Sequence, residues 1–184
     1  MWSLPILDFA RDLSSIPESG FTDEAVLAFL REHRADAASL APYLHFSPDH
    51  YTRNLIHRTP LFELIAICWE PGQKSAIHNH RGQRCWMAAA MGSVLVHNFR
   101  LIRQDAAAGY CDIESTTHFV IAADSPAEVD PAEPIHRVSN PSSSGERAVT
   151  LHVYSKPYNV CEVYDLKNRS YKEVQLVNTT EFGK

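Results

Sequence analysis

The spacing of apolar and polar residues divides the chain into two regions that meet near residue 50. Within the first region, apolar side chains recur at helical spacing between residues 25 and 30. Thr22 or Asp23 can cap this helix, because a side-chain oxygen at that position accepts a hydrogen bond from the first helical turn. A second short helix over Asp36–Ala41 is predicted to end before Pro42, because proline disfavours helical geometry in the residue before it. The first fifty residues are therefore predicted to be mainly helical.

From Tyr51 onward the pattern changes to short strands separated by turn residues. Phe62–Trp69 is apolar at nearly every position, which is typical of a strand covered on both faces. A hairpin is predicted over Cys161–Leu176, with its turn at Asp165–Asn168. Six further strands are predicted at Ser75–His80, Arg84–Ala90, Ser93–Phe99, His118–Ala122, Ile135–Asn140 and Ala148–Ser155. Many short strands at regular spacing indicate an all-β sandwich or barrel.

The length and composition fit one globular domain. With 184 residues, of which 45% are hydrophobic and 21% charged, we expect residues 1–184 to form a single domain. In it, a helical layer (1–50) covers a β-barrel and C-terminal hairpin (51–184). A net charge of −5 gives no electrostatic reason to bind nucleic acid. No apolar run approaches the roughly 18 residues of a membrane-spanning helix. We therefore expect neither nucleic acid nor a membrane as a partner. We also expect the protein to be a monomer.

The cysteines and the start of the chain indicate a cytoplasmic protein. Asp8, Arg11 and Asp12 interrupt the apolar start, so no signal peptide is expected. The four cysteines lie far apart, without a C-x-x-C pair, which is typical of reduced thiols in the cytosol.

The first candidate chemistry is the pair His78 and His80. On a strand, residues i and i+2 share one face, so both imidazoles point inward while Asn79 points away. Two imidazoles on one face can converge on Zn, Cu, Fe or Ni. The pair alone is a weak signal, because ten histidines in 184 residues produce about half an H-x-H by chance.

Flanking residues strengthen this signal. Gly72 precedes His78 by six positions and Gly92 follows His80 by twelve, which resembles the first cupin motif. Further along, the segment His136–Asn140 resembles the end of the second cupin motif. There, Pro131 occupies the motif's proline position and Glu133 replaces its glycine. Together the motifs predict a cupin double-stranded antiparallel β-barrel, with His78, His80 and His136 as metal ligands.

Cys85 stands where the cupin motif has a glutamate, five residues after His80. Non-heme iron oxygenases usually combine two histidines with a carboxylate, but this chain offers three neutral imidazoles. The ion would keep its full positive charge until an anionic ligand arrives. A substrate thiolate would supply that charge.

Together these segments resemble the cysteine dioxygenase type I family, from about Tyr51 to Phe182. The matching segments are Tyr51–Asn54, Cys68-Trp69, His78-x-His80-x4-Cys85, His136–Asn140 and Leu151–Ser155. The resemblance implies a cupin barrel with an N-terminal helical layer and an Fe(II) cofactor. It also implies a reaction that adds both atoms of O₂ to the sulfur of L-cysteine, giving cysteine sulfinic acid.

The resemblance also implies a role for each site residue. Arg53 matches the arginine that holds the substrate carboxylate, and Tyr51 matches a residue lining the substrate pocket. Tyr154 matches the active-site tyrosine, Cys85 the cysteine that bonds to it through a thioether, and His152 the histidine that hydrogen-bonds its hydroxyl.

The residue types agree with these roles. In the strand Ala148–Ser155, three polar side chains at 150, 152 and 154 share one face, as suits the wall of a site. Arg53 suits a carboxylate, because its planar fork donates two parallel hydrogen bonds.

Several alternatives stay open at this level. Three histidines and a water can also hold zinc, Cys85 can remain an unmodified buried thiol, and Arg53, His152 and Tyr154 can be structural. The substrate can be another small thiol acid, such as 3-mercaptopropionate, because Lys156 replaces the first proline of the Ser-Pro-Pro that follows the tyrosine in animal enzymes. The chain can also be a non-catalytic metal-binding cupin.

Overall fold

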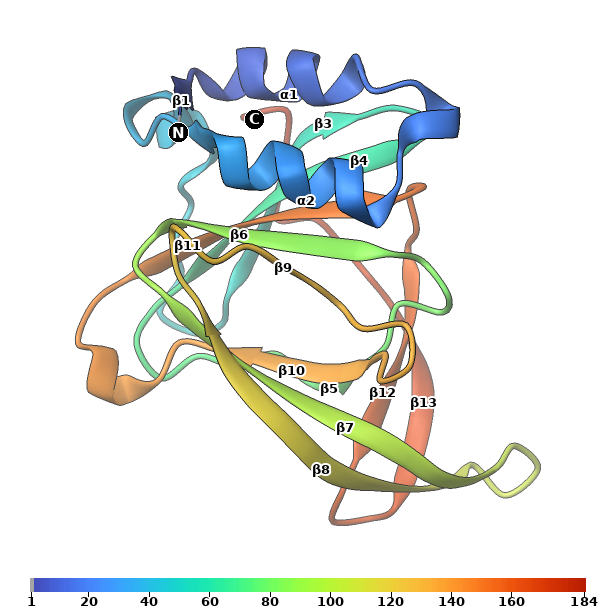
Figure 1. Cartoon of the computed structure of the whole chain (residues 1–184). Coiled ribbons are helices and arrows are strands. Elements are labelled where there is room, and N and C mark those ends of the chain that lie inside the picture. The colour runs from blue at the N-terminus through green and yellow to red at the C-terminus, as the bar shows by residue number, and fades with distance from the viewer. Residues whose placement is uncertain (1) are drawn as a thin grey trace.

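Two β-sheets face each other, and helices cover the outer face of one of them (Figure 1). The computed structural model describes residues 2–184. Sheet I has the order β14-β3-β4-β11-β6-β9, and sheet II closes on itself in the order β10-β5-β12-β13-β8-β7. None of the helices in the described chain is long and apolar enough to span a bilayer.

The strands of sheet I are β3 (Thr52–Arg58), β4 (Phe62–Trp69), β6 (Cys85–Met91), β9 (Ala127–Glu128), β11 (Ala148–Ser155) and β14 (Thr180–Glu181). Those of sheet II are β5 (Ile77–His78), β7 (Val94–Asp105), β8 (Tyr110–Ile121), β10 (Ile135–Ser139), β12 (Val160–Asp165) and β13 (Ser170–Gln175). The predicted all-β barrel behind an N-terminal helical layer is confirmed.

The helical layer consists of α1 (Ile6–Ser14) and α2 (Asp23–Glu32), with 3₁₀ turns at Glu18–Gly20 and Ala38–Tyr43; a third lies at Ser142–Ser144. Thr22 caps α2, since its side-chain oxygen accepts from the Ala25 N–H at 3.3 Å. Asp23 ties α2 to β6, because it accepts a hydrogen bond from the Trp86 indole. Both ends of the described chain lie at this layer in Figure 1.

The predicted end of the second helix was wrong. The segment is a 3₁₀ helix that contains Pro42. The Leu40 N–H donates to the Ala37 carbonyl and the Leu44 N–H to the Ala41 carbonyl, so Pro42 removes only one donor from the series. Two short strands that the pattern did not predict, β1 (Trp2–Leu4) and β2 (His33–Ala35), pair in parallel within the helical layer.

Sheet I is buried on both faces, as the continuous apolar run of β4 predicted. All eight residues of β4 are buried. Alternate positions such as Phe62 and Leu64 pack against the helices, whereas Ile65, Ile67 and Trp69 pack toward sheet II. This second face is the wall on which the candidate site is built.

Gly92 closes the turn between β6 and β7. Its φ is +61°, and a Cβ atom there would lie 2.8 Å from the Arg147 carbonyl oxygen. A side chain is excluded by both conformation and space, which explains why the second glycine of the motif stands at this position.

Candidate metal centre

Three imidazoles meet between the two sheets. His78 on β5 and His136 on β10 are register partners, and their ring centres lie 4.5 Å apart. The His80 ring centre lies 5.2 Å from that of His78 and 4.8 Å from that of His136. One ring nitrogen from each residue lies within 4.8 Å of the others. The three predicted ligands are thus brought together, although β5 is shorter than the predicted strand and ends before His80.

Backbone carbonyls fix the tautomers of two of these rings. The Nδ1 atom of His78 lies 3.1 Å from the Ala76 carbonyl oxygen, and that of His136 lies 3.2 Å from the Pro134 carbonyl oxygen. Because a carbonyl only accepts, each Nδ1 carries the proton and each Nε2 keeps its lone pair for a ligand.

The third ring, His80, has no partner for either nitrogen within residues 2–184, although both nitrogens are buried. Buried polar groups are normally hydrogen-bonded, so an orphaned imidazole needs an explanation. A bound ion would satisfy it.

Burial keeps the three histidines neutral. It lowers the pKa of His78 to about 4, and together with the neighbouring His78 it lowers the pKa of His136 to about 3. Burial and the two other imidazoles hold the pKa of His80 well below its usual range. Neutral imidazole is the form that ligates metal, so the donor set fits a divalent ion such as Fe(II) or Zn(II).

A chain of buried hydrogen bonds reaches the site along β11. The Trp69 indole N–H donates to Thr150 Oγ1 at 2.9 Å, and this oxygen lies 2.9 Å from Nε2 of His152. The Tyr154 hydroxyl lies 3.2 Å from Nδ1 of the same ring. The three polar side chains of β11 share one face, as predicted.

The donors and acceptors in this series of hydrogen bonds follow from the Thr150 hydroxyl, whose hydrogen needs an acceptor. Its hydroxyl hydrogen has no other acceptor within residues 2–184, so it donates to Nε2 of His152. Nδ1 of His152 then carries the ring proton and donates to the Tyr154 oxygen. The hydroxyl hydrogen of Tyr154 therefore remains free to point into the site.

Cys85 lies directly opposite Tyr154, on the neighbouring strand β6. Its sulfur lies 3.9 Å from Nδ1 of His152, the atom that also contacts the Tyr154 hydroxyl. Both side chains are buried, and burial raises the pKa of the Cys85 thiol and of the Tyr154 phenol. The thiol and the phenol thus converge, un-ionised, on one ring nitrogen.

Arg53 approaches the same tyrosine from β3. Its guanidinium carbon lies 5.5 Å from the centre of the Tyr154 ring, and the centre of the His80 ring lies 5.2 Å from the same point. The Nε atom of Arg53 is buried without a partner within residues 2–184. Tyr51, two residues earlier, stacks on Trp69 and lines a cavity of about 510 Å³ together with Arg53.

Tyr158 belongs to this group and was missed from the sequence. Its ring centre lies 5.1 Å from that of Tyr154 and 5.8 Å from that of His80. Its hydroxyl is buried and has no partner in the described chain. The residue lies in the loop after Pro157, outside the strand pattern, so only its nearness to a predicted site strand could have drawn attention to it.

The C-terminal segment also contributes to the site, which the strand pattern did not predict. The Thr179 N–H donates to the Arg53 carbonyl at 2.7 Å, and the Arg53 N–H donates to Thr179 Oγ1 at 3.2 Å. Arg53 and Tyr158 share a second cavity, of about 580 Å³, with this segment. The tail therefore holds the strand that carries Arg53.

The fold and the three-histidine centre define a cupin-type β-barrel with a candidate metal site. Residues 11–167 match the family model of cysteine dioxygenase type I. The chain belongs to that family, and the membership supports a thiol dioxygenase activity.

Relatives with this description come from several vertebrates. Cysteine dioxygenase type 1 of Homo sapiens is 27% identical over 161 residues, which cover 87% of this chain and 78% of that protein. The Rattus norvegicus protein is 29% identical with the same coverage. Among solved structures, a double-stranded β-helix protein from Klebsiella pneumoniae is 18% identical, covering 74% of this chain and 94% of its own, with a TM-score of 0.48.

Proposed function

We propose that this protein is an Fe(II)-dependent dioxygenase that converts L-cysteine and O₂ into cysteine sulfinic acid. The observation that carries the proposal is a cluster of buried polar groups without partners: His80, Arg53 and Tyr158. Such groups are costly unless a ligand satisfies them. A metal ion on the histidines would satisfy His80, and a substrate carboxylate would satisfy Arg53.

In this proposal His78, His80 and His136 hold the iron. When bound, iron would supply the redox chemistry and a ligation site that favours a thiolate over a thiol at neutral pH. Because the three ligands are neutral, an anionic substrate sulfur would lower the charge of the centre.

The side chains of sheet I would position the substrate. Arg53 would accept the carboxylate in a bidentate pair, with Tyr51 lining the pocket beside it. The free hydroxyl hydrogen of Tyr154 would point toward the reacting groups, held there by His152. Orientation of this kind lowers the barrier by fixing the reactants close together. The reaction balances without a further reductant, since both oxygen atoms end on the thiol sulfur.

Turnover tests this proposal directly. Iron-loaded protein given cysteine and O₂ should consume oxygen and form the sulfinate in equal amounts. Absence of product from protein with full iron content would contradict it. Zinc-loaded protein is the control for the metal, because zinc has no redox chemistry and should give no product.

A second candidate substrate is 3-mercaptopropionate, which has no amino group. The observation that favours it is Lys156, which adopts a left-handed φ of +61° beside the loop that carries Tyr158. Catalytic efficiency should be compared for both thiols in the wild type and in Arg53→Gln. The cysteine proposal predicts that the wild type prefers cysteine and that the variant loses efficiency with both thiols, because Arg53 would hold the carboxylate that both of them carry.

Turnover and metal content of the wild type and of Tyr154→Phe distinguish a dioxygenase from a non-catalytic metal-binding protein. The dioxygenase proposal predicts a large loss of turnover with unchanged metal content. A sensor or structural module would show no turnover in either form.

We also propose a thioether between Cys85 and Tyr154. The support is their convergence on Nδ1 of His152 from neighbouring strands. Forming the carbon–sulfur bond removes one hydrogen from each side chain, with O₂ as the oxidant. The intact mass should fall by two hydrogens, and Cys85→Ser should abolish the change. Full sequence mass after many turnovers would contradict the cross-link.

A further inference from the structure

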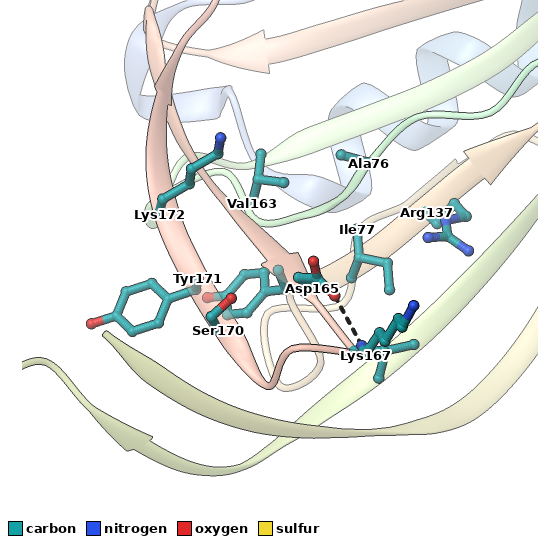
Figure 2. A pocket seen from close by; sticks show the side chains of 11 residues that line it. Ala76, Ile77, Arg137, Val163, Asp165, Lys167, Ser170, Tyr171 and Lys172 are labelled. Atoms are coloured by element: carbon teal, nitrogen blue, oxygen red, sulfur yellow. Dashed lines mark hydrogen bonds between the residues drawn. The ribbon is translucent and has the colours of Figure 1, made fainter. Parts of the chain in front are cut away.

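One buried arginine nitrogen without a partner lies away from the candidate metal centre. In residues 2–184 the buried side-chain atoms without partners belong to His80, Arg53 and Tyr158 at the site, and to Glu128 and Arg137 elsewhere. Arg137 follows the ligand His136 on β10. Because side chains alternate along a strand, it points to the opposite face of sheet II. There it lines the cavity of about 660 Å³ shown in Figure 2.

This cavity combines an apolar wall with positive charge. Ile77, Val163 and Leu166 supply apolar surface. In Figure 2 the Arg137 guanidinium and Lys167 lie on the same side of the pocket, next to Ile77, whereas Lys172 extends on the opposite side. None of these three cations forms an ion pair within the described chain.

The one carboxylate in the lining is already engaged. Asp165 Oδ1 accepts from the Lys167 N–H at 2.9 Å, the contact dashed in Figure 2, and from the Asn168 N–H at 3.0 Å. Its Oδ2 accepts from the Asn168 amide at 2.7 Å. The carboxylate thus stabilises the turn between β12 and β13. Three unpaired cations remain around the cavity, in a chain whose net charge is −5.

We propose that this cavity binds a small organic carboxylate. The carboxylate would accept hydrogen bonds from Arg137 and Lys167, and the apolar part would lie against Ile77 and Leu166. Arginine suits this role because its fork donates two parallel hydrogen bonds. A ligand here would contact the strands β5 and β10, whose other face presents His78 and His136. The proposal does not depend on the dioxygenase activity.

Calorimetric titration of the full-length protein with phenylacetate tests the proposal. The neutral isostere phenylacetamide controls for the charge. Arg137→Gln should weaken phenylacetate binding about tenfold or more. Phenylacetamide should bind the wild type no more tightly than phenylacetate binds Arg137→Gln. Lys167→Gln, at an exposed turn where folding is not at risk, should weaken binding by a smaller factor of about three.

Two further variants separate this cavity from other anion sites. Arg53→Gln removes the arginine at the metal centre, and Arg34→Gln removes one exposed positive charge from β2; both should leave the affinity unchanged. Loss of binding in Arg53→Gln with retention in Arg137→Gln would place the anion at the metal centre and overturn the proposal. Equal weakening by Arg34→Gln and Arg137→Gln, or absence of binding to the wild type, would overturn it as well.

Discussion

Thr150 occupies the middle of the buried hydrogen-bond chain between Trp69 and His152. Replacing it with valine preserves the shape but leaves the indole N–H and one imidazole nitrogen without partners. Each buried orphan costs about 1–3 kcal/mol, so Thr150→Val should lower the free energy of unfolding by about 2 kcal/mol or more in urea denaturation. Thr150→Ser keeps the hydroxyl and should lose less than half as much. Equal losses in the two variants would show that the hydroxyl is not the cause.

Removing the hydroxyl of Tyr158 should raise the stability of the free protein but weaken substrate binding. It is buried without a partner in the described chain, so Tyr158→Phe should stabilise the free protein by about 1 kcal/mol. If the hydroxyl donates to the substrate, the same change should raise the KM for cysteine about fivefold, corresponding to about 1 kcal/mol. Thermal unfolding and steady-state kinetics check the two effects. A destabilised variant with an unchanged KM would contradict both expectations: that the hydroxyl lacks a partner in the free protein, and that it donates to the substrate.

Strand alternation explains which site residues could be predicted individually. Thr150, His152 and Tyr154 lie two residues apart on a strand, so their common face follows from the sequence. Tyr158 lies in a loop, where no periodicity relates sequence position to direction. The direction of the hydrogen-bond chain also needed the structure, because it depends on Trp69, which is 81 residues from Thr150.

At the scale of elements, the turn after β11 depends on Lys156. This residue has φ +61°, and its N–H donates to the Leu61 carbonyl at 2.6 Å. Lys156→Pro fixes φ near −65° and removes the donor, so it should destabilise the protein by about 3 kcal/mol or more. Lys156→Gly permits the left-handed conformation and should raise stability by a few tenths to about 1 kcal/mol. Urea denaturation checks both variants, and a proline variant as stable as the glycine variant would contradict the role of this backbone.

The predicted ends of an element were most accurate where its burial determines the pattern of apolar residues in the sequence. The run Phe62–Trp69 became β4 with the predicted ends, because both faces of that strand are covered. β7 and β8 extend well beyond the predicted segments, to Asp105 and from Tyr110. Nine of these fourteen extra residues are exposed, and seven of the nine are polar. They form an antiparallel ribbon through backbone pairing and contacts such as the Arg100–Glu114 ion pair, which hydrophobic periodicity does not reveal.

For the whole molecule, metal binding should join parts of the barrel that are distant in sequence. The three histidines proposed as ligands come from β5, β10 and the segment after β5. A ligand that binds only the folded state at 100 times its Kd stabilises it by about 2.7 kcal/mol. For 184 residues this corresponds to a rise in Tm of about 5–10 °C. Removing the metal with a chelator should reverse the rise.

His136→Ala should abolish this rise in Tm, whereas His118→Ala, at an exposed position of β8, should retain it. Thermal scans of metal-loaded and chelated samples check the comparison. A full rise in His136→Ala would place the metal elsewhere.

The arrangement of the whole site was predictable only where motifs carried it. The two histidine motifs lie about 56 residues apart, yet the barrel register expected of a cupin brings His78 opposite His136. No motif predicted the C-terminal segment that holds Arg53, or the cavity lined by Arg137 on β10. Both arise from contacts between segments whose sequences show no common pattern.

Labelling with ¹⁸O₂ tests the central claim most directly, because it combines substrate, metal and reaction in one product. Iron-loaded protein should convert cysteine into the sulfinate with both sulfur-bound oxygen atoms labelled, and His136→Ala should form none. A product with one or no labelled oxygen, or no product from fully iron-loaded protein, would contradict a dioxygenase built on the three histidines.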